Sequence, residues 1–200
     1  MILRHRHWQL APLAPAVLFE RFSALDPLVV QLLYNRGLTT RDEVDFFITG
    51  ADVTGNPFTL AGMGPAVSLI RQLLAAGESI VVYGDYDVDG ITATAVLVQT
   101  LESLGGHVQP YIPDREDEGY GLNCAAIRDL AGAGVGLLIT VDCGIRSLEE
   151  VALARRLGMA VVITDHHHLG EALPPANAVL NPRRPDSDYP FKDLAGVGVA

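Results

Sequence analysis

The chain has 200 residues, 49% of them hydrophobic and 19% charged, and this much apolar surface can offset the entropy of ordering the chain, which excludes a disordered protein. No apolar run approaches the roughly 18 residues that span a bilayer, and two cysteines are too few for a disulfide framework, so we expect a soluble cytoplasmic protein without a membrane partner. Fourteen Lys and Arg against 24 Asp and Glu give a formal net charge of −10, which excludes binding of nucleic acid by bulk electrostatic attraction, because that mode needs a basic surface. If the protein acts on an anionic substrate, metal ions or a few well-placed arginines must supply the positive charge.

The first 60 residues follow a helical pattern. Thr40 and Glu43 have the spacing of a capping box, so a helix is predicted to begin at Thr40 and to end at Gly50. Residues 50–64 are rich in Gly, Pro and Asn, which is typical of a linker. We therefore expect residues 1–60 to form a small helical segment and its linker, with two earlier helices at 17–25 and 28–34.

From residue 61 to residue 200 the pattern alternates between helix and strand. The third and fourth strands lack polar alternation, as expected of central parallel strands that are covered on both faces. Alternating units of this kind predict an α/β fold with a doubly wound, mainly parallel sheet. The predicted order is a helix at 65–76, a strand at 79–83, a helix at 91–104, a strand at 107–112, a helix at 123–131, a strand at 137–141, a helix at 147–157 and a strand at 160–164.

Candidate metal ligands follow three of the four predicted strands. Asp85, Asp87 and Asp89 follow the first strand, Asp142 follows the third, and the segment 165–168 (DHHH) follows the fourth. Each motif alone has an ordinary explanation, since an aspartate after a strand often caps a helix. In open α/β sheets, however, sites form beyond the carboxyl ends of the strands. We therefore expect these side chains to meet at one edge of the sheet.

The three aspartates after the first strand also indicate a cation. In an extended segment alternate side chains point the same way, so Asp85, Asp87 and Asp89 would share one side. Two carboxylates about 5 Å apart repel by about 3 kcal/mol at an effective dielectric constant near 20, and a divalent cation usually offsets such repulsion. An EF-hand is excluded, because the twelfth position from Asp85 is Val96 instead of the required Glu, and a strand precedes the motif.

The mixture of donors indicates which metal. Histidine together with several carboxylates favours Mn²⁺, with Mg²⁺ as the alternative and calcium disfavoured. More than four candidate ligands favour two ions, and two ions roughly 3.5–4 Å apart form the arrangement that hydrolyses phosphoesters. Two ions would also bring positive charge to an acidic edge. The residues alone therefore predict a two-metal phosphoesterase.

Six segments together resemble the DHH phosphoesterases, and within that superfamily the single-strand-specific 5′→3′ exonucleases. The resemblance is dense from Ile80 to Ala200 and thin before residue 60, where Trp8 and the turn at 35–37 contribute. It implies release of 5′-mononucleotides from single-stranded DNA in DNA repair and recombination, with a single-strand-binding protein and a helicase as protein partners. The segments are NRGL, GDYDVDGITATAVL, YIPDREDEGYGLN, LITVDCGI, VVITDHH and NPRRPDSDYPFKDLAGVGVA.

The resemblance also implies a role for each residue of the predicted edge. Asp87 and Asp89 are implied as metal ligands, Asp142 as the bridge between two ions, His166 as a ligand of the second ion, Asp85 as a further ligand or a group that positions water, His167 as the contact to the scissile phosphate, and Asp165 as the residue that orients the histidines.

Four residues between the second strand and the following helix are implied to bind substrate. Gly119 and Gly121 would let the backbone approach the nucleotide, and Tyr120 would contact a base or sugar; the alternative is that this motif is a structural turn. Arg115 would hold the substrate phosphate, since its guanidinium matches phosphate geometry; the alternative is an ion pair with Glu116 or Glu118.

One departure from the family pattern concerns length. The family carries a further metal-binding aspartate after the segment 196–198 and then a second domain, whereas this sequence ends at Ala200. We therefore expect the DHH domain at 61–200 to be truncated at its C-terminus. Two other functions remain open: a DHH hydrolase of short oligonucleotides, phosphoadenosine phosphate or pyrophosphate, and a non-catalytic DHH replication scaffold. The GYGLN motif argues against the first, and the presence of the expected ligands argues against the second.

Overall fold

The computed structural model describes residues 9–50 and 55–200, and none of the helices in these ranges is long and apolar enough to cross a membrane. Trp8 lies outside the described residues. The chain divides into two compact units, residues 1–53 and residues 54–200. Each unit is described by itself below.

The first unit contains three helices, α1 (Ala16–Arg21), α2 (Pro27–Asn35) and α3 (Arg41–Thr49). The predicted capping box is confirmed, because the Thr40 side chain accepts a hydrogen bond from Glu43 N while the Glu43 carboxylate accepts one from Thr40 N. Helix α1 ends earlier than predicted, since Asp26 caps α2 and the preceding residues form the connection. A small core holds the unit together, formed by Ala14, Leu18, Phe22, Val30, Leu33 and Val44.

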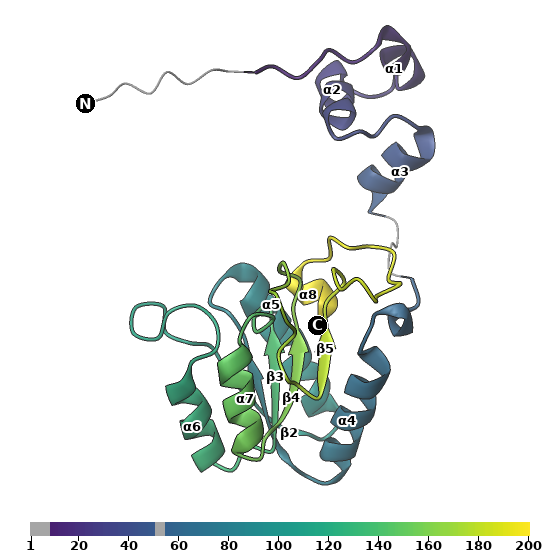
Figure 1. Cartoon of the computed structure of the whole chain (residues 1–200). Helices are drawn as coiled ribbons and strands as arrows, with labels where there is room; N and C mark the ends of the chain where they lie inside the picture. The colour runs from purple at the N-terminus through teal and green to yellow at the C-terminus, as the bar shows by residue number, and fades with distance from the viewer. Residues whose placement is uncertain (1–8, 51–54) are drawn as a thin grey trace, which may run out of the picture. The chain divides into compact units, whose positions relative to one another are not determined.

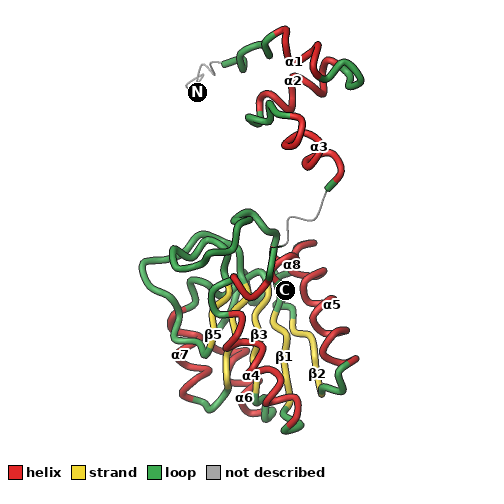
Figure 2. The backbone as a smooth tube through the Cα atoms, turned by 90° about the vertical axis from the view of Figure 1, so that its right-hand side faces the viewer, coloured by secondary structure: helices red, strands yellow, loops and turns green. Residues whose placement is uncertain are grey.

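The second unit is built on a parallel five-stranded sheet in the order β2-β1-β3-β4-β5 (Figures 1 and 2). The predicted α/β class with a doubly wound parallel sheet is confirmed. Three of the predicted strands have the predicted bounds, and a short fifth strand beside β4 was not predicted. The strands are β1 (Ser79–Tyr83), β2 (His107–Tyr111), β3 (Leu137–Val141), β4 (Ala160–Thr164) and β5 (Ala178–Leu180).

Helices cover both faces of this sheet (Figures 1 and 2). Successive side chains of a strand point to opposite faces, so each strand contributes to two apolar cores, one between each face and its helices. Ile80 and Val82 pack in the core that includes α4 and α5, whereas Val81 and Tyr83 pack in the core that includes α6 and α7. The helices of this unit are the 3₁₀ turn η1 (Pro57–Thr59), α4 (Met63–Ala75), α5 (Val88–Ser103), α6 (Cys124–Gly132), α7 (Leu148–Arg156) and α8 (Gly196–Val199).

The predicted linker at 50–64 is shorter than expected on its C-terminal side. Helix α4 begins at Met63, two residues before Pro65, and Gly62 forms its N-cap with φ +91°. Glycine is required there, because a Cβ would lie 2.6 Å from the carbonyl oxygen of Val179 in β5. The start of α4 is therefore set by close contact with the last strand of the sheet.

Candidate metal centre

The loop between β1 and α5 does not have the extended conformation that the alternating aspartates predict. Helix α5 begins at Val88, and Asp87 is its N-cap, accepting hydrogen bonds from Asp89 N at 2.8 Å and Gly90 N at 3.0 Å. Asp89 therefore lies in the first turn of a helix, so the expectation that all three carboxylates share one side is wrong. The turn is tight, since a Cβ on Gly90 would lie 2.6 Å from Asp85 N.

Asp142 follows β3 in an unusual conformation. Of the non-glycine residues that the structure describes, it alone has a positive φ, +60°. Its side chain is 2% exposed, and although His166 Nε2 lies 3.1 Å from Oδ1, no residue in the described parts of the chain donates a hydrogen bond to that oxygen. A buried carboxylate oxygen without a donor is costly. This oxygen is positioned to bind a group that the protein itself does not supply.

The electrostatics of the edge agree with this geometry. The pKa of Asp142 is raised to about 7, chiefly by burial and then by the charges of Asp89 and Asp87, with His167 acting in the opposite direction. Burial also raises the pKa of Asp85, against the hydrogen bond that Tyr86 N donates to it. A bound cation would lower the pKa of both carboxyl groups, because it favours their charged forms. Carboxylate and imidazole donors fit Mn²⁺ or Mg²⁺.

The donor atoms form two groups that share Asp142. In each group, one donor atom per residue lies within 4.8 Å of the others; the first comprises Asp85, Asp87 and Asp142, and the second comprises Asp142, His166 and His167. Asp89 belongs to the side of the second group, because its Oδ2 lies 3.6 Å from His166 Nε2. The edge can therefore hold two cations on either side of one buried carboxylate.

Asp165 organises the histidines that follow β4. Its buried carboxylate accepts main-chain hydrogen bonds from Ile145, His166 and His167, and His167 Nδ1 lies 2.7 Å from its Oδ1. A carboxylate only accepts, so Nδ1 of His167 carries the proton of this hydrogen bond. The ring orientation of His167 is thereby fixed, and its Nε2 remains for a metal or a substrate.

Residues after β5 also contact the centre; their segment carries part of the family resemblance, but sequence patterns assigned none of them a role. Gly196 N and Val197 N donate to the two oxygens of Asp89 at 2.6 and 2.7 Å. Asn181 and Arg183 donate to the main-chain carbonyls of His167 and His166. Every residue except proline has a main-chain amide, so residue types do not show which amides bind a carboxylate. The resemblance of the segment to the family was the available signal, and its Gly196 leaves room for the centre, since a Cβ there would lie 2.6 Å from Asp142 Oδ1.

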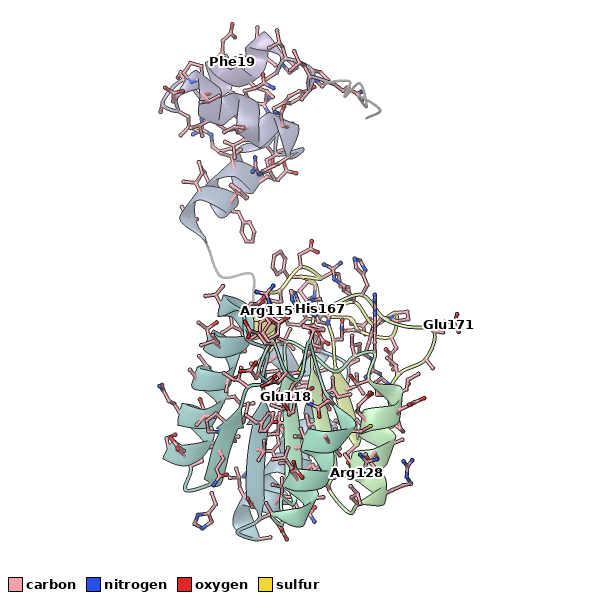
Figure 3. The ribbon with its side chains drawn as sticks, turned by 90° about the vertical axis from the view of Figure 1, so that its left-hand side faces the viewer. Phe19, Arg115, Glu118, Arg128, His167 and Glu171 are labelled. Atoms are coloured by element: carbon pink, nitrogen blue, oxygen red, sulfur yellow. The ribbon has the colours of Figure 1, made fainter. Side chains whose placement is uncertain are left out.

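The loop that was predicted to bind substrate lies at the same edge (Figure 3). Tyr120 donates a hydrogen bond to the main-chain carbonyl of Asp142 at 3.3 Å, and its hydroxyl lies 3.5 Å from His167 Nδ1. Gly119 and Gly121 have φ values of +78° and +81°, which this turn requires, and a Cβ on either would meet nothing within 4 Å.

Arg115 lies at this edge as well, over a neighbouring ring. Its guanidinium is 5.2 Å from the ring centre of Tyr86. Among the ion pairs of the described residues, Arg115 pairs with neither Glu116 nor Glu118. The Glu118 carboxylate instead accepts hydrogen bonds from Tyr111, Asn123 and Asp114 N, so it is not simply a solvated surface charge.

A cavity of about 460 Å³ opens beside His167. Its polar side chains come from three loops and from the start of α7, and sequence patterns did not single out those from the loop before α7. The arginine of that loop, Arg146, also donates from Nε to the main-chain carbonyl of His168 at 2.9 Å. The lining is Tyr120, Gly121, Leu122, Gly144, Ile145, Arg146, Ser147, Glu150, Asp165, His167 and His168.

Comparison with known proteins gives the same picture. The sequence model of the DHH family, N-terminal domain, matches residues 79–200. The chain is 45% identical over 177 residues to the single-stranded-DNA-specific exonuclease RecJ of Bacillus subtilis (strain 168), covering 88% of this chain and 22% of that protein. It is 39% identical over 178 residues to the RecJ of Escherichia coli (strain K12), covering 88% of this chain and 30% of that protein. The chain thus spans about a fifth to a third of these relatives.

Solved structures of relatives have the same fold. A crystal structure of exonuclease RecJ bound to manganese superposes with a TM-score of 0.62 at 39% identity, covering 70% of this chain and 35% of that chain. A crystal structure of RecJ from Thermus thermophilus in complex with Mn²⁺ superposes with a TM-score of 0.70 at 31% identity, covering 96% of this chain and 27% of that chain. The same protein has also been crystallised with Mg²⁺.

Proposed function

The chain belongs to the DHH family, and from that premise we propose that it forms the metal-binding part of an exonuclease that releases 5′-mononucleotides from single-stranded DNA. The observation that carries the proposal is the buried Asp142 oxygen, which lies between two groups of donors and has no partner in the described chain. The RecJ relatives support the substrate, because they are single-stranded-DNA-specific exonucleases.

Two Mn²⁺ ions are the proposed cofactors, with Mg²⁺ as the alternative. Asp85, Asp87 and Asp142 would hold one ion, and Asp89, Asp142 and His166 would hold the other. If bound by these residues, two ions would supply a hydroxide at neutral pH and positive charge opposite the phosphoryl oxygens. Solved relatives that contain Mn²⁺ and Mg²⁺ support both choices.

The chain's own residues would bind and orient the substrate. We propose that His167, fixed by Asp165, presents Nε2 to the scissile phosphate, and that the cavity beside it receives the terminal nucleotide against Tyr120. Arg115 would hold a substrate phosphate, which its exposed position at the edge allows. A role in DNA repair and recombination would place the protein in the cytoplasm, with a single-strand-binding protein and a helicase as partners.

The decisive assay is Mn²⁺-dependent release of nucleotide from single strands labelled at the 5′ end. We expect release from the single strand, but not from a duplex, pyrophosphate or phosphoadenosine phosphate. Asp142→Asn should remove the activity, whereas Glu171→Gln, which makes the same change of charge at an exposed carboxylate, should keep it. Hydrolysis of a small substrate alone would contradict the proposal. Mn²⁺ binding without release from any of the four would favour a non-catalytic scaffold.

A further inference from the structure

The segment from Asn181 to Val197, which we call the clasp, forms hydrogen bonds with metal-ligand candidates that follow two different strands. It begins directly after β5 and runs along the edge of the sheet to α8 (Figure 1). Its first residues bond the main chain of His166 and His167, and its last residues bond the carboxylate of Asp89. The clasp therefore connects groups that different strands bring to the edge.

Asn181 holds the first end. Its side chain is fully buried, Nδ2 donates to the carbonyl of His167 at 2.9 Å, and Oδ1 accepts from Arg183 N at 2.8 Å. Both ends of the amide are thus in use, and an isosteric carboxylate could not donate to the carbonyl.

Arg183 joins the two ends of the clasp. Its Nε donates to the carbonyl of His166 at 3.0 Å, and Nη2 donates to Asp193 Oδ1 at 2.8 Å. Asp193 lies shortly before the two amides that bond Asp89. A guanidinium can donate in two directions from one rigid plane, which an ammonium cannot do with the same geometry.

We propose that the clasp is the positioning device of the metal centre, with Arg183 and Asn181 as positioning residues for His166 and His167. The inference rests on the metal centre proposed above. His166 Nε2 lies 3.1 Å from Asp142 and 3.6 Å from Asp89, and the three residues follow three different strands. Because the clasp bonds two of these three segments, its loss changes the spacing of the donors although it removes none of them.

The chain offers a matched control next to Arg183. Arg184 also donates to a main-chain carbonyl and pairs with a carboxylate, but the carbonyl belongs to Val179 in β5 and the carboxylate is Asp186. Arg183→Ala and Arg184→Ala therefore remove the same kinds of contact, and only the first removes a contact to a histidine of the centre.

The experiment is a titration of the full chain with Mn²⁺, followed by the EPR signal of the free ion, together with thermal melting in EDTA. Arg183→Ala should weaken Mn²⁺ binding about 10–100-fold, and Arg183→Lys should restore part of it. Arg184→Ala should bind Mn²⁺ as the wild type does, even if it melts at a lower temperature. Unchanged affinity in Arg183→Ala, or an equal loss in Arg184→Ala, would overturn the proposal.

A metal-free measurement separates this proposal from the proposed function. In EDTA, the ring ¹H–¹⁵N signals of His166 and His167 should shift in Arg183→Ala and stay in place in Arg184→Ala. Failure of the wild type to bind Mn²⁺ would contradict the proposed function. The histidine signals would still show whether the clasp positions His166 and His167. Unchanged signals in Arg183→Ala would show that the clasp does not position the histidines.

Discussion

Asp142 makes the metal-free protein sensitive to pH. Its pKa is raised from 3.8 to about 7 in the folded chain. Between these two values the folded protein keeps a proton that the unfolded chain has already released, so the free energy of unfolding falls as pH rises through this window. About one unit above pH 7 both states are almost fully ionised at this residue, and the loss of stability is nearly complete.

Replacing this carboxyl with an amide should therefore stabilise the protein when metal is absent. In EDTA we expect Asp142→Asn to melt at a higher temperature than the wild type at pH 8, with a smaller difference at pH 5, where the folded wild type is protonated. Asparagine also tolerates the left-handed backbone of this position. Melting curves at both pH values, with Glu171→Gln as the control, test this. Equal differences at pH 5 and pH 8 would show that the Asp142 charge is not the cause.

Gly196 leaves room for the Asp142 side chain. A Cβ at this position would lie 2.6 Å from Asp142 Oδ1 and 2.7 Å from Asp142 Cβ, and the buried aspartate has no space to retreat. We expect Gly196→Ala to lower the melting temperature and to abolish stabilisation by Mn²⁺. Gly198→Ala on the same helix is the control, because its nearest neighbour would be the flexible Leu194 side chain at 3.1 Å. Similar melting and Mn²⁺ response in both variants would contradict this expectation.

Helix α5 begins at a residue that is both a cap and a candidate ligand. Asp87 accepts the free N–H groups of Asp89 and Gly90, which places the start of the helix three residues before the predicted position. The sequence contains the signal for this cap, but the same aspartate also fits an alternating row of ligands. The start of α5 at Val88 and the two hydrogen bonds that Asp87 accepts show that it caps the helix.

The two roles of Asp87 can be separated by two substitutions. Asp87→Asn and Asp87→Ala both remove the charge, so both should weaken Mn²⁺ binding. Asparagine still caps a helix and alanine does not, so Asp87→Ala should be less stable than Asp87→Asn by about 0.5–2 kcal/mol. Urea denaturation in EDTA measures the difference in the free energy of unfolding between the two variants. Both variants lack the charge of Asp87, so the relief of repulsion between carboxylates is the same in both and cancels. Equal stability of the two variants would mean that the cap contributes nothing.

The sequence predicts best those elements whose pattern is most apolar. Strands β1, β3 and β4 are continuous apolar runs and have the predicted bounds. Strand β5 has three residues, too few to show a period, and pairing with β4 makes it a strand. The meeting of Asp85, Asp142 and His166 followed from parallel strand ends, whereas the clasp acts through carbonyls and amides that every residue carries.

At the scale of the whole molecule, all the donor groups found in the described residues belong to the α/β unit. Residues 9–50 have a core of their own. A ligand that binds only the folded state stabilises the part of the molecule whose folding creates its site. The stabilisation by metal should therefore be unevenly distributed along the chain.

Hydrogen exchange followed by mass spectrometry can locate this effect. Saturation with Mn²⁺ at about 100 times its dissociation constant should add about 2.7 kcal/mol of stability, seen as slower exchange in β1, β3 and β4. Exchange in α1, α2 and α3 should not change, and EDTA should reverse the effect. Protection of the three N-terminal helices, or none in the strands, would disagree with a centre built wholly by residues 55–200.

The hydrogen bonds from Gly196 and Val197 to Asp89 also fix when this centre can be finished during synthesis. The donors are encoded 107 residues after the acceptor. At typical ribosome speeds, about 5 to 20 s pass between the two. Once residue 141 has been added, β1, α5 and β3 can already exist as nascent structure, yet the carboxylate of Asp89 still lacks both of its amides. The Asp89 side of the centre can therefore be completed only after residues 196 and 197 have been synthesised.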